Sequence, residues 1–417
     1  MSEIPVLHST VRGWLLDGPL AAYVPTYVAR LKRGEYAAGT MRRYLNGVGH
    51  FAHWMMLCRL NVDRLDESRV DQFLNEHLPH CGCPAQALRH PRDAHAAIMP
   101  LLAILRERGV IAELPRAAGP IAEELQRYDR HMRDARGLAA ISRENRLRIA
   151  QRFLLGRFAG GPLQFGKLTP EDIRRFVAEQ LELRNTVSNA IAINSALRAY
   201  LRWRCTQGDA VKPLLAAIAS PANWRMASLP RALRPEQVES VLNAIAGLRR
   251  WPKRAYAIVR LALDLGMRVG EIAWLQLDDI DWRQGTVTIK RSKSRRQDVL
   301  PLPQSTGKAL EDYIRHERPR CRNRAVFVRH LAPHDKPVGA CAIRVVVSRV
   351  FKRAGIPHGR THALRHTLAC RLVSGGTPIK EVADVLRHRS LNTTLIYAKL
   401  NLGALADVAM PWPGSVA

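Results

Sequence analysis

The sequence predicts a mainly α-helical protein (α+β) with a small antiparallel sheet in its C-terminal part and all-α modules before it. Apolar residues recur at helical intervals over most of the 417 residues. The exception is the stretch 277–302, whose alternating and β-branched residues predict strands at 286–290 and 298–302. A basic turn, 291–297, joins these two strands.

Two segments in the N-terminal half resemble each other. They begin at Tyr27 and Tyr128, and each has a helical stretch, a capped helix start at Asp66 or Thr169, and a second helical stretch. The second stretches are 94–108 and 186–205. The apolar positions align in pairs: Leu45 with Leu147, Val48 with Ala150, Phe51 with Phe153, Leu65 with Leu168, Val70 with Ile173, and Phe73 with Phe176. The pattern predicts two related all-α modules, 1–114 and 119–219, although any two helical bundles share such spacing.

Proline marks the boundaries of these modules. Pro115 and Pro120 divide one from the other, and the stretch 220–232, with Pro221 and Pro230, is predicted to be a linker. A helix start at Pro235 then opens a C-terminal domain, 233–401, followed by a tail, 402–417. Helices are predicted in that domain at 255–265, 307–317, 341–353, 363–374, 379–386 and 392–399, with a short apolar helix at 402–408 of the tail.

The net charge indicates a polyanionic partner. Lys+Arg 65 against Asp+Glu 36 gives +29, which favours nucleic acid and predicts salt-dependent binding. Arginines that are merely solvated are the alternative. The segment 186–204, which carries Arg198, Arg202 and Arg204 after Arg184, is our candidate for a major-groove helix. The same side chains also fit a surface on which arginines lie along the bundle.

The sequence does not have the features of a membrane protein or a secreted protein. No run of about eighteen uncharged apolar residues is present, and the N-terminal residues lack the basic and apolar regions of a signal peptide. The 7 cysteines are odd in number and mostly scattered, which argues against a disulfide framework and predicts a cytoplasmic location.

One cysteine cluster offers residues of the types that bind zinc. It contains His77, His80, Cys81, Cys83 and His90. Its Cys-x-Cys spacing departs from the usual zinc motifs, and no second cysteine pair follows. We therefore expect a polar loop between two helices and predict no metal and no cofactor, and whether this cluster binds zinc stays open.

Residues near the C-terminus have the chemistry for cleaving a phosphodiester. Arg268 and Arg365 can face the non-bridging oxygens with planar donor pairs. Arg365 lies three residues after His362, on the same helical face. A phenol such as Tyr397 can act as nucleophile if a base or cationic pocket takes its proton. Taken singly, each of these residues also fits a surface charge or a core tyrosine.

The motifs that hold these residues resemble the tyrosine recombinase (phage integrase) family in order and spacing. They are LALDLGMRVGEIAWLQLDDID, SKSRRQDVLPLP, THALRHTLACRLVSGG and VLRHRSLNTTLIYAK. The resemblance is close over 234–399 and looser over the second helical module, which is similar to a core-binding domain. It implies a phosphate-activating pocket and a nucleophile formed by Arg268, Lys293, His362, Arg365, His388 and Tyr397.

The resemblance also implies the roles of these residues. Tyr397 would form a 3′-phosphotyrosyl link, His362 would assist proton transfer, and His388 would donate to a non-bridging oxygen. Lys293, with Lys290 as its competitor, would protonate the leaving 5′ oxygen. Arg295 and Arg296 of the same turn are expected to contact DNA. Four protomers would act on double-stranded DNA through a Holliday junction, with or without companion recombinases, and without metal or ATP.

Three features depart from a minimal enzyme of this family. Arg387 occupies a place where the family most often has Gly, which would add a phosphate contact or reshape the turn. Residues 1–114 are additional and would bind further DNA or a partner recombinase. The tail would dock on a neighbouring protomer. Two other functions stay open: DNA relaxation of the type IB topoisomerase kind, and DNA binding without catalysis.

Overall fold

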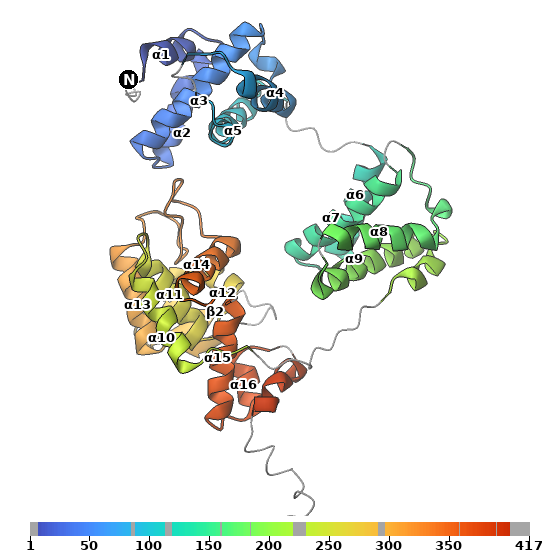
Figure 1. The fold of residues 1–417 in the computed structure, drawn as a ribbon, viewed down its shortest axis with the longest axis vertical. Helices are drawn as coiled ribbons and strands as arrows, with labels where there is room; N and C mark the ends of the chain where they lie inside the picture. The colour runs from blue at the N-terminus through green and yellow to red at the C-terminus, as the bar shows by residue number, and fades with distance from the viewer. Residues whose placement is uncertain are drawn as a thin grey trace, which may run out of the picture. The chain divides into compact units, whose positions relative to one another are not determined.

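The computed structural model describes residues 7–84, 88–112, 119–158, 161–183, 185–219, 231–290, 297–357, 359–388 and 390–400. Over these residues the protein is mainly helical with a small antiparallel sheet, as the sequence predicts (Figure 1). Most of the boundary 115–120, most of the predicted linker 220–232 and the whole of the tail lie outside the described residues. Within the described part, no helix has the length and apolar character needed to cross a membrane.

The N-terminal module, residues 7–112, is built around a long central helix. Its helices are α1 Ser9–Leu16, α2 Val24–Arg33, α3 Ala38–Leu57, α4 Glu67–Gln72 and α5 Pro91–Glu107, with a π-helical segment Phe73–His77 after α4. Helix α3 packs against both α1 and α5. Its buried face, which includes Leu45, Val48 and Phe51, forms the middle of one hydrophobic cluster.

The middle module, residues 119–219, has a core of its own. Its helices are α6 Pro120–Arg130, α7 Ala140–Phe158, α8 Pro170–Leu183 and α9 Val187–Thr206. Helix α7 packs against α6 and α9. Large aromatic side chains, among them Tyr128, Phe153 and Tyr200, fill the interior.

The two modules repeat one order of elements. In each, a long helix (α3 or α7) leads through a 3-10 turn, Val62–Arg64 or Phe165–Lys167, to a capped helix and a further long helix. The Asp66 carboxylate accepts a hydrogen bond from the Arg69 backbone N–H at 2.9 Å. In the second module, Thr169 and Asp172 cap each other. The aligned apolar positions are buried in both modules except Leu147, which is half-buried at the edge of its cluster.

The C-terminal domain, residues 231–400, packs helices around α11. Its helices are α10 Pro235–Ala246, α11 Pro252–Asp264, α12 Val269–Trp274, α13 Gln304–His316, α14 Ala340–Arg353, α15 Thr361–Ser374 and α16 Ile379–Val385. Helix α11 contacts α10, α12, α13, α14 and α15. This burial explains why Ala257, Ile258, Leu261 and Ala262, on successive turns, are all apolar.

The sheet has the order β1-β2-β3 and is antiparallel throughout. Strands β2 Thr286–Ile289 and β3 Asp298–Pro301 are the predicted pair, and Val287 lies opposite Leu300. The additional strand β1 Ile280–Asp281 pairs with β2. Two residues are too few to show the alternation that marks a strand in sequence.

The segment around Tyr397 differs from the predicted helix 392–399. It forms two 3-10 segments, Leu391–Thr393 and Leu395–Leu400, separated at Thr394. Thr394 is fully buried, because its hydroxyl contacts His388 rather than solvent. This interruption turns the Tyr397 side chain into the domain instead of along a continuous helix face.

Candidate active site

Arg365, on the buried face of α15, reaches the ends of two other helices. Its guanidinium donates hydrogen bonds to the carbonyl oxygens of Gly266, just after α11, and Leu386, just after α16. Gly266 has φ +56°, and a Cβ at this position would lie 3.0 Å from a methyl group of Leu386. Glycine is therefore required where the chain turns from α11 toward the site.

Arg268 precedes α12 and is fixed by Glu271 at the first turn of that helix. The guanidinium of Arg268 lies 2.7 Å from the Glu271 carboxylate, which also accepts from the Arg268 backbone N–H at 2.8 Å. A second guanidinium nitrogen donates to the Arg387 carbonyl oxygen at 3.1 Å. Burial by itself would raise the pKa of Glu271, but Arg387 and Arg268 outweigh it and hold that pKa below its usual value.

Arg387 faces inward. Its backbone is left-handed, with φ 54°, which accounts for the glycine expected at this place. Its side chain is buried and lies 2.9 Å from the Glu271 carboxylate and 2.9 Å from the Val385 carbonyl oxygen. Of the two roles considered for Arg387, the geometry supports a structural one, since the guanidinium ties the end of α16 to α12.

Three guanidiniums thus lie around one carboxylate, and two of them contact it directly. Glu271 pairs with Arg268 and Arg387, while Arg365 is bonded to carbonyl oxygens. Burial, Arg268 and Arg387 lower the pKa of Arg365 to about 9, so its guanidinium keeps its charge at neutral pH. An excess of buried positive charge with fixed donors suits a phosphate anion.

Tyr397 is buried beside this cluster, and its hydroxyl lies 2.7 Å from Nδ1 of His366. Burial raises the pKa of Tyr397 to about 12, although the nearby Arg365 acts in the opposite direction. Burial also lowers the pKa of His366, and His362 and Arg365 add to this effect. A neutral imidazole with its proton on Nε2 accepts the phenol proton at Nδ1.

His366 is absent from the residues that the sequence singles out. Two signals were available: it directly follows Arg365, and it lies one helical turn after His362. His362 itself is exposed near the start of α15, with its ring centroid 6.4 Å from that of His366.

His388 is held by the threonine at the 3-10 interruption. Its Nδ1 lies 2.7 Å from the Thr394 hydroxyl. Burial, Arg365, Arg268 and Arg387 lower the pKa of His388 to about 4. The imidazole is therefore neutral at pH 7, and when Thr394 donates to Nδ1 the proton remains on Nε2.

The basic turn that carries Lys293, Arg295 and Arg296 lies outside the described residues. Its competitor Lys290 is described, and its ammonium group lies 2.6 Å from the Asp279 carboxylate. This ion pair raises the pKa of Lys290, which is opposite to what a proton donor at neutral pH requires.

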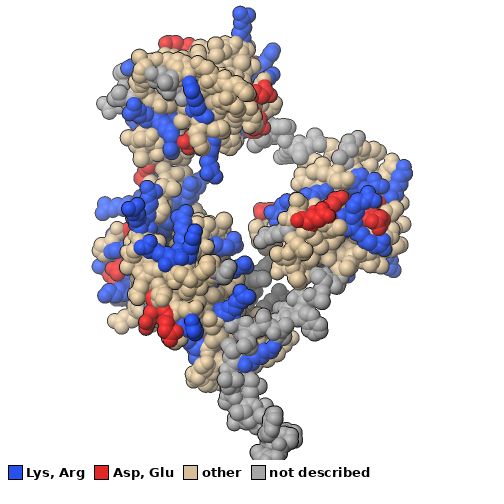
Figure 2. All heavy atoms as spheres, in the orientation of Figure 1, with Lys and Arg blue, Asp and Glu red and all other residues tan. Residues whose placement is uncertain are grey.

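The arginines of α9 have different surroundings. Arg202 is exposed, whereas Arg198 donates to the Ile218 carbonyl oxygen at 2.5 Å. Arg204 lies 3.0 Å from the buried Glu124 and 3.9 Å from the centre of the Phe165 ring. Arg204 therefore has an internal role in the middle module. Arg184 lies outside the described residues. Over the visible faces in Figure 2, Lys and Arg cover more surface than Asp and Glu.

Sequence comparisons identify relatives over nearly the whole chain. The model of the Phage integrase family matches residues 231–403. The "Putative integrase/recombinase y4rA" of Sinorhizobium fredii is 34% identical over 95% of this chain and 96% of its own length. The "Tyrosine recombinase XerD" of Mycobacterium tuberculosis is 28% identical over 71% of this chain and 97% of its own.

Solved structures share the fold. The Tn1549 transposon integrase in complex with transposon right end DNA matches with a TM-score of 0.53 and 18% identity, over 68% of this chain and 99% of that one. A lambda integrase dimer bound to a COC′ core site gives a TM-score of 0.51 and 18% identity, over 65% and 96% of the two chains. With the arginine cluster and the buried tyrosine, these matches lead to one conclusion. The protein belongs to the phage integrase family and is a tyrosine-type site-specific DNA recombinase.

Proposed function

We propose that this recombinase cuts and rejoins DNA strands through a 3′-phosphotyrosyl intermediate on Tyr397. The observation that carries the proposal is the 2.7 Å hydrogen bond between the Tyr397 hydroxyl and His366, next to Arg365. A potential nucleophile, a proton acceptor and a fixed cation meet there, as covalent catalysis at a phosphate requires.

The first transesterification moves two protons. The phenol gives its proton to Nδ1 of His366 and attacks phosphorus, and the bond from phosphorus to the 5′ oxygen breaks. Lys293 protonates the departing oxygen, which becomes a free 5′-hydroxyl. His362 assists proton transfer at the nucleophile once DNA covers the start of α15.

The cations and His388 act on the non-bridging oxygens. Arg268 and Arg365 donate to them as negative charge develops. With Thr394 donating to Nδ1 of His388 across their 2.7 Å contact, the Nε2–H of His388 is the donor toward the phosphate. Glu271 and Arg387 act on the reaction by positioning Arg268.

The second transesterification reverses the first with another strand. A 5′-hydroxyl from the partner DNA attacks the phosphotyrosine, and Tyr397 leaves with its proton restored. The phosphotyrosine retains the bond energy, so the scheme needs neither ATP nor metal. Two such rounds, through a Holliday junction held by four protomers on double-stranded DNA in the cytoplasm, complete recombination, with or without companion recombinases.

DNA would be held by the helical modules together with the C-terminal domain. We assign the domains as 1–114, 119–219 and 233–401, with a linker at 220–232 and a tail at 402–417. Exposed Arg202 on α9 is the candidate for direct contact, as are Arg295 and Arg296 of the basic turn. The N-terminal module would bind additional DNA or a partner recombinase, and the tail would dock on a neighbouring protomer.

Trapping the covalent complex tests this proposal. Sequencing DNA that is covalently attached to the protein in its native host would give the target, from which a substrate with a nick beside the cleavage site is built. The wild type should form an adduct that resists denaturation, and Tyr397→Phe should form none. Tyr313→Phe, which alters a buried tyrosine on α13, is the matched control and should still form it.

Either of two results would overturn the proposal: no adduct with the wild type, or an adduct that survives Tyr397→Phe. Relaxation of a supercoiled plasmid that lacks the target site would instead indicate a type IB topoisomerase activity.

A further inference from the structure

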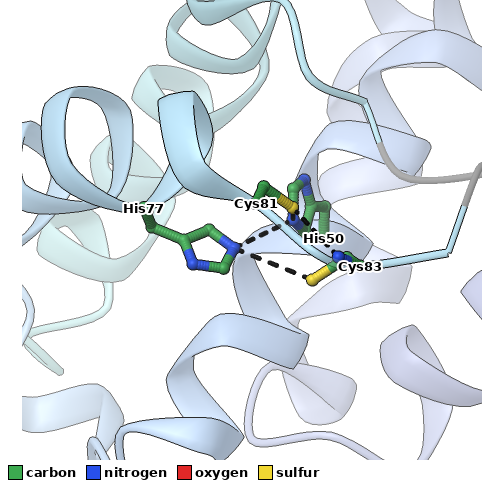
Figure 3. Close-up of side chains that lie close together, drawn as sticks. All are labelled: His50, His77, Cys81 and Cys83. Atoms are coloured by element: carbon green, nitrogen blue, oxygen red, sulfur yellow. Dashed lines mark hydrogen bonds between the residues drawn. The ribbon is translucent and has the colours of Figure 1, made fainter.

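The N-terminal module brings together two imidazoles and two thiols. Their ligand atoms, from His50, His77, Cys81 and Cys83, all lie within 4.8 Å of one another (Figure 3). His50 comes from the middle of α3, His77 from the end of the π-helical segment, and the cysteines from the loop that leads to α5. Three of these residues belong to the cluster that the sequence indicates, whereas His50 joins it only through folding.

Three of the six separations among these atoms are close to the edges of a tetrahedral zinc site, and the other three are within 4.8 Å. Nε2 of His50 lies 3.2 Å from Nε2 of His77 and 3.3 Å from Sγ of Cys81, and Sγ of Cys83 lies 3.7 Å from Nε2 of His77. With ordinary zinc–nitrogen and zinc–sulfur distances, tetrahedral edges are about 3.3 Å for two nitrogens and about 3.6 Å for nitrogen and sulfur. Each measured separation is within about 0.3 Å of its edge.

The orientation of His50 also fits ligation. Its Nδ1 lies 2.9 Å from the Leu88 carbonyl oxygen. A carbonyl oxygen only accepts, so Nδ1 carries the proton and the lone pair of Nε2 points at the cluster. Metal-bound histidines are commonly held in this way by a backbone carbonyl.

The surroundings of the cluster are apolar. The ring of Phe73 lies 5.2 Å from that of His50 and 5.5 Å from that of His77. Trp14 and Trp54 lie within 6.3 Å and 6.4 Å of these imidazoles, and Cys83 belongs to the same hydrophobic cluster. Four protein ligands beside such aromatic rings are typical of a structural zinc site rather than of a catalytic one, which keeps an open position.

Hydrogen bonds alone account less well for this arrangement. The single lone pair of His50 Nε2 would have to accept from both the His77 N–H and the Cys81 S–H. A cation bound by neutral imidazoles and deprotonated thiols removes this competition. Two sulfurs and two nitrogens in tetrahedral positions favour zinc among the divalent metals.

We propose that His50, His77, Cys81 and Cys83 bind one structural zinc ion that fastens the loop before α5 to the middle of α3. His80 and His90, the other members of the sequence cluster, are exposed and are not ligands. The site is independent of the recombination chemistry. It makes the folding of the N-terminal module depend on zinc.

Metal analysis of the full-length, untagged protein tests the site. Mass spectrometry of the metal content should give about one zinc per chain. His50→Ala and Cys83→Ser should lose it, and His80→Ala and Cys58→Ser, which alter exposed residues of the same module, should retain it. Hydrogen exchange should show that chelation deprotects α3 and α5 in the wild type and has no further effect in Cys83→Ser.

Cobalt substitution covers the case in which the ligand variants fail to fold. The reduced wild type, stripped of metal and given Co²⁺, should show the visible bands of tetrahedral cobalt and a near-ultraviolet thiolate band. The proposal is overturned if the wild type holds far less than one zinc and takes up no Co²⁺. Equal metal content in ligand variants and controls would overturn it as well.

Discussion

At the scale of single residues, the site depends on where protons reside. Tyr397 is protonated at rest because burial raises its pKa to about 12, and its hydroxyl lies 2.7 Å from Nδ1 of His366, the proton acceptor that we propose. Release of the phenol proton therefore requires a proton acceptor that is already in place. His366 provides this without charge of its own, since burial lowers its pKa.

Replacing His366 should slow cleavage without preventing DNA binding. We expect His366→Ala to reduce the rate of adduct formation by about 10²-fold or more, which is the usual contribution of a proton acceptor. His366→Asn should be similarly slow, because its amide oxygen can accept the hydrogen bond of the phenol but cannot take its proton. Single-turnover cleavage of the nicked substrate measures the rates of both variants, and fluorescence anisotropy of labelled DNA measures their binding. Cys370→Ala, beside Tyr397, is the control. An unchanged rate in His366→Ala would exclude this role.

Glu271→Gln should destabilise the C-terminal domain in a pH-dependent way. The pKa of Glu271 is held below its unfolded value of about 4.3. Its ion pairs therefore stabilise the fold above that pH, and this stabilisation is lost as the pH falls through the lower, folded pKa. At pH 7 we expect a loss of about 3–5 kcal/mol, because a buried ion-pair partner disappears.

Urea unfolding of Glu271→Gln and the wild type at pH 7 and near pH 3 measures this effect. The difference between the two proteins should narrow at the lower pH. Glu311→Gln removes an exposed partner of Arg315 and should change the stability by less than about 1 kcal/mol. An equal effect of the two substitutions would contradict the buried network.

The side chains that we propose to react are easier to recognise in the sequence than the side chains that hold them in position. Arg268, Arg365, His388 and Tyr397 were selected by residue type and motif, and the fold gathers them around α15. Glu271 lies in a quoted motif, but a carboxylate three residues after Arg268 also fits a helix cap. Its second partner, Arg387, is more than a hundred residues away in sequence. Such contacts arise only when α12 and α16 meet.

At the scale of elements, the two helical modules use matched helix starts. Asp66 caps α4, and Thr169 caps α8 through its reciprocal bonds with Asp172. Both lie just after a 3-10 turn in the repeated order. The helix starts are thus determined locally, which explains why the sequence predicted them within a few residues.

Removing either cap should weaken its own module. Asp66→Ala and Thr169→Ala should each cost about 1 kcal/mol of local stability. Hydrogen exchange resolved by segment should show faster exchange in α4 for the first and in α8 for the second. Asp71→Ala, an exposed position within α4, should have little effect. Similar changes in both modules after a single substitution would argue against separate cores.

The sequence does not predict elements that form only through contacts with residues distant in the chain. The two-residue strand β1 forms because β2 offers it hydrogen bonds. The break at Thr394 forms because its hydroxyl meets His388, whereas the local sequence favours an unbroken helix. His50 looks like an ordinary member of a helix core until the loop with Cys81 and Cys83 folds against it.

At the scale of the whole molecule, the net charge of +29 should dominate DNA affinity. Using Tyr397→Phe, so that binding is not coupled to cleavage, we expect affinity to fall about 10³-fold or more between 50 and 200 mM salt. Anisotropy with labelled duplex DNA measures this. An affinity that stays constant over that range would rule out binding dominated by phosphate contacts.

Arg202 and Arg204 offer a comparison within one helix. The logarithm of DNA affinity falls linearly with the logarithm of salt concentration. Arg202→Ala should reduce the slope of this line by about one if Arg202 contacts a phosphate. Arg204→Ala removes the partner of Glu124 and should instead lower the stability of the middle module. Salt titrations of DNA affinity measure the phosphate contact, and urea unfolding measures the stability of the middle module. A reduced slope with unchanged stability in Arg204→Ala would reverse our assignment.

The resting state of Tyr397 bears on how a cell tolerates such a protein. Its hydroxyl is bonded to His366 of its own chain and stays protonated at neutral pH. If Tyr397 is the nucleophile, as we propose, a copy that meets arbitrary DNA carries it in protonated form, and we expect brief encounters to leave no nicks. On our proposal, that proton leaves for His366 only as the phenol attacks a phosphate seated among the arginines. On our proposal, the burial that keeps the Tyr397 hydroxyl protonated at rest would thus also limit cleavage away from the target site.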